Sequence, residues 1–217
     1  MHLDASILLV VTIAALSVVA HESAHGWVAL LCGDSTARER GRLSPMPLRQ
    51  VDPLGSLVVP LGLVAFHSSL LYGWARPVPV DHGRLARPRR DAVLVALAGP
   101  AINLLLAIGF AAAARAIPQG GSGAKLHAAA CAGVAWNCAL ALFNLIPIPP
   151  LDGSWVLMHF LKLRHILALH HFRVIALAVV VAMALVPPSR WLFEASLRGA
   201  VGTCLGLFGM DASGALR

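Results

Sequence analysis

The sequence predicts an all-α polytopic membrane protein with about five to six membrane segments, a short cytoplasmic hairpin and one re-entrant segment. Composition is the first observation behind this prediction: 58% of the 217 residues are hydrophobic and only 12% are charged, and the mean hydropathy is +0.77. The second is that apolar stretches of about 20 residues, enough to cross a hydrocarbon core of roughly 30 Å, recur with little polar sequence between them. Residues 1–217 are therefore expected to form one integral-membrane domain.

The first part of the chain is expected to contain one helix, one polar connector and one broken apolar segment. The helix covers residues 7–32 and ends where Gly33 and Asp34 supply a C-terminal stop. The connector at residues 36–51 contains four arginines and two prolines, which favour extended or hairpin structure over helix. Residues 54–72 are apolar but are interrupted by glycine and proline.

Three further spans are expected after a second basic connector at residues 76–91. Clean apolar spans cover residues 92–114 and 126–146, with a glycine-rich turn between them. Prolines that follow residue 146 closely then break the helix. Residues 165–186 are interpreted as another span, with basic residues at its N-terminal end.

Residues 191–210 allow two interpretations. Glu194 and Arg198 favour a helix that lies in the membrane interface. Gly202 and Gly206, at the spacing of small residues that let two helices approach closely, favour a packed helix instead. The sequence leaves both open.

The distribution of basic residues predicts the topology. Most of the 17 Lys and Arg residues fall in residues 36–51, 76–91 and 147–173, and the positive-inside rule places these regions on the cytoplasmic side. For both Arg-rich connectors to share that side, residues 54–72 must enter and leave by the same face; a full crossing is the alternative. The net charge of +7 therefore serves membrane orientation, and no nucleic-acid partner is expected.

An HExxH motif, His21-Glu22-Ser23-Ala24-His25, lies inside the first apolar helix. Positions four apart share one helix face, so both imidazoles can reach one zinc ion. The intervening glutamate can then accept a proton from a water molecule. The motif also arises by chance in helices, but ionisable residues within a membrane span are costly unless they are paired or ligated. The sequence therefore predicts a metal site.

A third ligand is needed, because a catalytic zinc site usually has three protein ligands. Asp152 is the candidate, since it follows the proline break; a helix N-cap is its alternative role. His21 lies roughly 21 Å along the first helix from residue 7, near the cytoplasmic end. If residues 92–114 lead outward and residues 126–146 lead back, Asp152 reaches the same face as the histidines.

The residues resemble those of the site-2 protease family, peptidase family M50, and specifically its short bacterial members without a PDZ domain. The resemblance covers nearly the whole chain. It rests on the segments His21-Glu22-Ser23-Ala24-His25-Gly26, 41–43, 51–55, Gly73-Trp74-Ala75-Arg76-Pro77-Val78-Pro79-Val80, Ala98-Gly99-Pro100 with Asn103, and 144–153. The family commonly has Asn-Pro-Leu-x-His where this chain has Met46-Pro47-Leu48-Arg49-Gln50, which weakens inferences about the substrate and leaves the metal assignment intact.

This resemblance implies an intramembrane zinc metalloprotease of the bacterial inner membrane, with one Zn²⁺ and an active site toward the cytoplasm. The substrate implied is a membrane-anchored regulatory protein, often shortened first by another protease. The site residues implied are the metal ligands His21, His25 and Asp152, the general base Glu22, and the site-lining residues Asn144 and Asn103. For the two asparagines, hydrogen bonding between helices is the alternative role.

Two rival functions remain. A non-enzymatic membrane protein that binds or transports metal would use the same histidines as a transit site, but such a site has no need of Glu22. An inactive relative that binds substrates without cutting them conflicts with the intact HExxH motif and Asp152. The substrate's identity and the oligomeric state, a homo-oligomer included, stay open.

Overall fold

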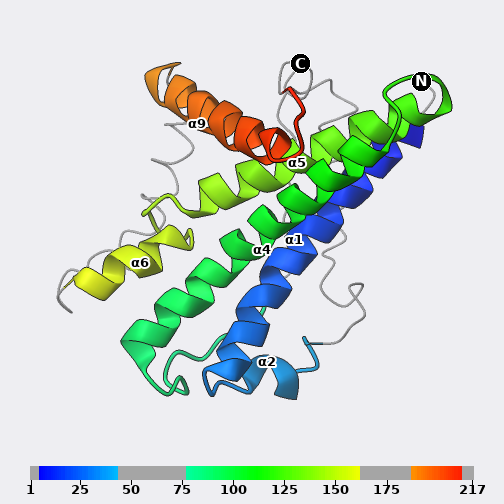
Figure 1. Ribbon diagram of the computed structural model, residues 1–217. Coiled ribbons are helices and arrows are strands. Elements are labelled where there is room, and N and C mark those ends of the chain that lie inside the picture. Colours follow the sequence, from blue (N-terminus) through cyan, green and yellow to red (C-terminus); the bar gives the residue numbers. More distant parts are fainter. Residues whose placement is uncertain (1–4, 44–76, 162–186, 212–217) are drawn as a thin grey trace.

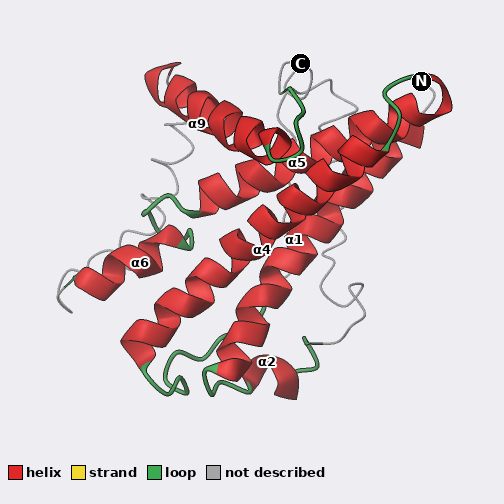
Figure 2. Cartoon of the chain, viewed as in Figure 1, coloured by secondary structure: helices red, strands yellow, loops and turns green. Residues whose placement is uncertain are grey.

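The computed structural model describes residues 5–43, 77–161 and 187–211. Every regular element within these ranges is a helix (Figure 2), in agreement with the predicted all-α class. Among the described residues, three helices are long and apolar enough to cross a membrane: Ile7–Leu31, Pro88–Ala116 and Gly121–Asn144. The predicted re-entrant segment at 54–72 and the span at 165–186 lie outside the described residues.

Three long helices form the centre of the molecule. They are α1 (Ala5–Leu31), α4 (Pro88–Ala116) and α5 (Ala124–Asn144), the last preceded by a 3₁₀ turn at Gly121–Gly123. α4 packs against both α1 and α5, and the short helix α6 (Gly153–Phe160) follows α5 and packs against α4 (Figure 1). α4 is thus the central helix of this part of the structure.

The boundaries of α1 and α5 agree with the sequence to within two residues, whereas α4 and the C-terminal helix, Pro187–Gly206, each begin four residues earlier than predicted. α1 ends one residue before the predicted limit, and Gly33 follows with φ 105°, a left-handed conformation that favours glycine. α4 begins at Pro88 and not at residue 92, because Asp91 accepts a hydrogen bond from the N–H of Arg87 at 2.7 Å and closes the first turn. Part of the predicted connector is therefore helical.

The first polar connector also contains a helix where extended structure was predicted. α2 (Thr36–Glu39) is a single turn. Asp34 stabilises it, since one carboxylate oxygen accepts the N–H of Thr36 at 2.9 Å and also the Thr36 hydroxyl. The local capping interaction outweighs the arginine and proline content on which the prediction relied. The connector beyond residue 43 lies outside the described residues.

The C-terminal helix α9 (Pro187–Gly206) packs against α5 and α4, as one of the two interpretations predicted. The contact is made by Val201, Cys204 and Leu205, which are buried. Gly206 is exposed, with no atom close to the position of a Cβ. The interface therefore depends on apolar side chains and not on the glycine spacing.

Candidate metal centre

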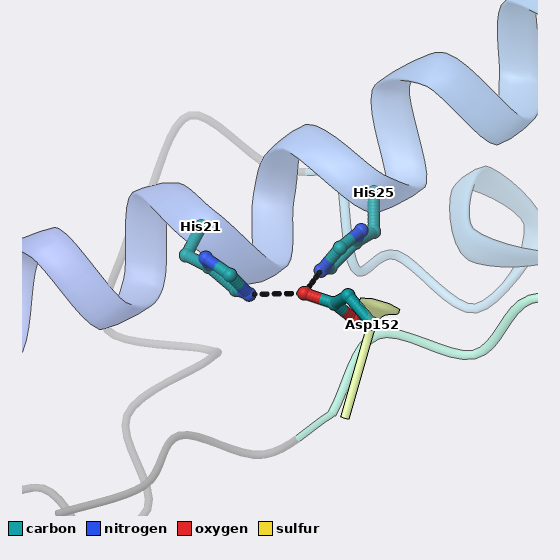
Figure 3. Close-up of side chains that lie close together, drawn as sticks. All are labelled: His21, His25 and Asp152. Carbon is teal, nitrogen blue, oxygen red and sulfur yellow. Dashed lines mark ion pairs between the residues drawn. The ribbon is translucent and has the colours of Figure 1, made fainter. Parts of the chain in front are cut away.

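Two imidazoles from α1 and one carboxylate converge at the centre of the structure (Figure 3). His21 and His25 point from one face of α1 toward Asp152, which lies in the turn between α5 and α6. The Nε2 atom of His21 lies 3.1 Å from Asp152 Oδ2, and the Nε2 atom of His25 lies 3.4 Å from the same oxygen. The structure thus brings together three groups that are far apart in sequence.

The hydrogen bonds behind the two rings determine which nitrogen faces the carboxylate. His25 Nδ1 lies 2.7 Å from the backbone oxygen of Val95, and His21 Nδ1 lies 2.6 Å from the side-chain oxygen of Asn103. Both oxygens accept, so each Nδ1 carries the hydrogen and each Nε2 carries a lone pair. This is the tautomer that a metal ligand requires.

The arrangement fits a zinc ion. Two nitrogen lone pairs that face a carboxylate oxygen repel it unless a cation lies between them, and Asp152 Oδ2 is enclosed without a hydrogen bond of acceptable geometry. The ligand atoms lie within 4.8 Å of one another. Tetrahedral zinc with bonds of about 2.0–2.1 Å separates its ligand atoms by about 3.3 Å, close to the observed 3.1 and 3.4 Å.

Gly99 of α4 provides the space that the two rings occupy. A Cβ at this position would lie 2.5 Å from His21 Cε1 and 2.6 Å from the Nε2 atoms of both His21 and His25. Such distances are well inside van der Waals contact. Any side chain at this position would therefore displace the imidazoles.

Glu22 is held by the segment that leads into α4. Its Oε2 accepts the backbone N–H of Val78 at 3.0 Å. Val78 lies between Pro77 and Pro79, which have no N–H, so it is the single donor of this tripeptide. Gly26 lets the segment approach α1, since a Cβ there would lie 2.7 Å from Val78 Cγ1.

The remaining predicted site residues differ in their positions. Asn103 contacts His21 directly. Asn144 donates to the backbone oxygen of Leu140 at 3.0 Å, and no described hydrogen bond or ion pair joins it to the three clustered residues. Asp152 occupies the N-cap position of α6 but makes no capping hydrogen bond with its side chain, so the alternative role does not account for its carboxylate.

Two polar residues that the sequence did not single out reach this cluster through Asn103. Asn103 donates to Asn137 at 2.9 Å, and Asn137 donates to Ser17 at 3.0 Å. The available signal was an amide inside the apolar span at residues 126–146, since polar side chains within a membrane segment are functional candidates. The Val95 backbone oxygen and the space at Gly99 have no comparable signal in a single sequence.

Known proteins resemble this chain over most of its length. The profile of peptidase family M50 matches residues 117–187. The provisionally named zinc metalloprotease YwhC of Bacillus subtilis is 42% identical over 142 residues, which is 61% of this chain and 60% of that protein. The provisionally named zinc metalloprotease Rip2 of Mycobacterium tuberculosis is 34% identical over 192 residues, 83% of this chain and 71% of that protein.

The Rip2 protein of Mycolicibacterium smegmatis shows a similar level of identity, 32% over 184 residues, covering 82% of this chain and 68% of that protein. The matched region therefore spans less than two thirds of the Bacillus relative and slightly more than two thirds of the mycobacterial ones. No solved structure matches the chain.

Proposed function

The chain belongs to the site-2 protease family, peptidase family M50, and on this basis we propose that it is an intramembrane zinc metalloprotease that hydrolyses peptide bonds of membrane-anchored proteins. The relatives are named as zinc metalloproteases, which confirms the predicted class and its zinc cofactor. Its long apolar helices make it a membrane protein. The intramembrane mechanism and the substrate class are the proposal.

The approach of Asp152 to both Nε2 atoms is the observation that carries the proposal. His21, His25 and Asp152 would hold the zinc ion. A zinc ion held there would polarise the scissile carbonyl and lower the pKa of water, which is the chemistry that peptide hydrolysis needs.

Glu22 is the general base in this mechanism. Its carboxylate accepts a proton from the attacking water and can return it to the nitrogen of the leaving amine. The Val78 N–H fixes the orientation of the carboxylate through its bond to Oε2. Asn103 and the Val95 backbone oxygen keep the Nδ1 atoms of the two histidines protonated and their Nε2 atoms available.

We place the site near the cytoplasmic face of a bacterial inner membrane, in a chain that crosses it several times. The position of His21 late in α1 and the basic residues of the 76–91 connector support this orientation. A helical substrate must unwind locally to expose its carbonyls before the scissile bond can reach the three ligands. Earlier shortening of the substrate by another protease and self-association of this chain belong to the same proposal.

The proposal is tested by comparing membrane proteomes of cells that carry the wild type with cells that carry Glu22→Gln. Loss of a general base lowers the rate by about 10²–10⁴-fold, so fragments of membrane proteins should accumulate only with the wild type. Identical fragment sets, in cells where candidate substrates are present, would contradict the proposal. Metal flux into liposomes without cleavage would support the transport alternative instead.

Metal content supplies a second test. His25→Ala should lose stoichiometric zinc after purification, because two ligands hold zinc far more weakly than three. His127→Ala is the matched control, since among the described residues the ring of this histidine contacts the backbone oxygens of Ala114 and Ile117 and the sulfur of Cys131, none of which belongs to the cluster. Full zinc content in the His25 variant would refute the ligand assignment.

A further inference from the structure

A line of buried polar side chains continues from His21 on the side away from Asp152. It runs from Asn103 on α4 to Asn137 on α5 and returns to α1 at Ser17. Successive donor–acceptor distances are 2.6, 2.9 and 3.0 Å. Ser17 lies four residues before His21, so the line ends on the face of α1 that carries the histidines.

Backbone carbonyls determine which atom of each side chain donates and which accepts along this line. Asn137 Nδ2 donates to the oxygen of Gly133 at 2.9 Å as well as to Ser17 Oγ, and the Ser17 hydroxyl donates to the oxygen of Ile13 at 2.8 Å. A carbonyl oxygen can only accept. The amide of Asn137 must therefore turn its nitrogen toward Gly133 and Ser17, and its oxygen toward Asn103.

The orientation of the Asn137 amide in turn fixes the orientation of the Asn103 amide and the tautomer of the His21 imidazole. Asn103 must offer its nitrogen to the oxygen of Asn137, which leaves its own oxygen for His21. An oxygen at this position requires a hydrogen on His21 Nδ1 and leaves the lone pair on Nε2. The tautomer of His21 is thus connected, through two amides, to fixed carbonyls of α5 and α1.

Burial makes the line difficult to rearrange. Asn103 and Asn137 are 0% exposed and Ser17 is 2% exposed. A side-chain amide inside an apolar bundle has no water to replace a lost partner, so each broken bond leaves an unsatisfied buried group. Both hydrogens of Asn137 Nδ2 are used.

We propose that Asn137 and Ser17 are positioning residues that act through Asn103 to hold the His21 imidazole in its zinc-binding tautomer and orientation. The inference rests on the proposed function, because it assumes that His21 is a zinc ligand. Ser17 lies one helical turn before His21 on the same helix, whereas Asn137 belongs to α5. Their effect on zinc is indirect and depends on the hydrogen bonds of the line.

Zinc affinity of the full-length protein, measured in detergent by competition with a chromogenic chelator, is the first test. Asn137→Leu preserves bulk and removes every hydrogen bond, and it should weaken zinc binding by about 10–100-fold. Ser17→Ala removes one neutral bond and should weaken it by about twofold to tenfold. Ser17→Thr keeps the hydroxyl and should restore wild-type affinity.

Thr12→Val is the matched control, because Thr12 also donates its hydroxyl to a carbonyl of α1 at 2.7 Å but is exposed and outside the line. It should bind zinc as the wild type does. Wild-type affinity in a folded Asn137→Leu protein would overturn the inference. If that variant does not fold, equal affinities of Ser17→Ala and Ser17→Thr would overturn it.

The tautomer of zinc-free protein is the second test, and it does not depend on activity. Nitrogen-15 NMR of histidine-labelled protein, with His21 identified from the missing signals of His21→Ala, should show hydrogen on Nδ1 in the wild type. Asn137→Leu should show a mixture of tautomers, whereas a residue needed only for packing would leave the tautomer unchanged and refute the inference. If the wild type binds no zinc, the proposed function fails, and this measurement still decides the hydrogen-bond claim.

Discussion

One ridge of α4 has two halves of different chemistry. Residues Val95, Gly99, Asn103, Ala107 and Ala111 follow one another at intervals of four, so they lie along one face, and all are buried. Val95 contacts one histidine of α1 through its backbone oxygen, and Asn103 contacts the other through its side-chain amide. Gly99, between them, has no side chain and so leaves space for both rings. Ala107 and Ala111 join an apolar cluster with α5 and α9.

The difference shows how one helix separates stability from chemistry. Lipid offers no hydrophobic drive for helix association, so the apolar half depends on close packing of small side chains. The polar half is costly to bury and is balanced only by complete hydrogen bonding. We therefore expect mutations in the polar half to alter zinc binding first, and mutations in the apolar half to alter unfolding first.

Gly99→Ala, in the polar half of the ridge, should have the largest effect on zinc affinity. The new Cβ would overlap both Nε2 atoms, and we expect zinc affinity to fall by about a hundredfold. Alanine favours helix over glycine by about 1 kcal/mol, which offsets part of the cost of about 1–3 kcal/mol for the overlap, so the free energy of unfolding should change less than zinc affinity does. Gly109→Ala, on the same helix with no atom within 4 Å of the Cβ position, is the control. Unchanged affinity in the Gly99 variant would show that the rings can move without loss.

Leu205→Ala tests the other half. Leu205 of α9 is 1% exposed within the apolar cluster, and its truncation should lower the free energy of unfolding by about 2 kcal/mol through lost packing. Zinc affinity should stay at the wild-type value. Leu207→Ala, at a position 63% exposed, should change neither quantity. Thermal unfolding followed by tryptophan fluorescence measures the change in stability. A loss of zinc affinity in the Leu205 variant would show that the two halves of the ridge are not independent.

Asp34→Asn should have a smaller effect, outside the ridge. Burial raises the pKa of the Asp34 carboxyl, but hydrogen bonds from the Thr36 hydroxyl and N–H and from the Asp81 N–H outweigh it, so the pKa is lowered. A lowered pKa adds stability above the unfolded value of roughly 3.9, and that stability is lost as the pH falls through the folded value.

The free energy of unfolding of the Asp34→Asn protein should therefore be lower at pH 7 by about 1 kcal/mol. As the pH falls, it should decrease less than that of the wild type. Unfolding temperatures between pH 7 and pH 3 measure this difference. Parallel curves for the two proteins would show that the carboxylate makes no net contribution. Zinc affinity at pH 7 should be the same in both.

The sequence predicted those features that depend on local spacing or on a specific resemblance. The interval of four between His21 and His25, inside a long apolar run, is sufficient to predict a shared face. Asp152 could be proposed because its segment resembles one family and because the order of spans brings it to the same side. The C-terminal end of α1 followed from a glycine stop, and the apolar share indicated helices in a membrane.

The features that were missed arise from particular side-chain hydrogen bonds, some between distant residues and some local. Asn137 and Ser17 are 120 positions apart, and no periodic pattern connects them. The α2 turn depends on one carboxylate, Asp34, whose bonds a composition rule cannot weigh. Asn144 was placed at the site by resemblance alone, and in the described part of the chain its side chain bonds to its own helix.

The Pro77-Val78-Pro79 tripeptide limits how a substrate can dock beside α1. An edge that recruits another strand needs both N–H and C=O groups, and this stretch has one N–H, already directed at Glu22. An incoming chain could only donate its own N–H groups to the carbonyl oxygens of this stretch. The prolines thus make this flank of Glu22, the proposed base, a poor template for strand addition.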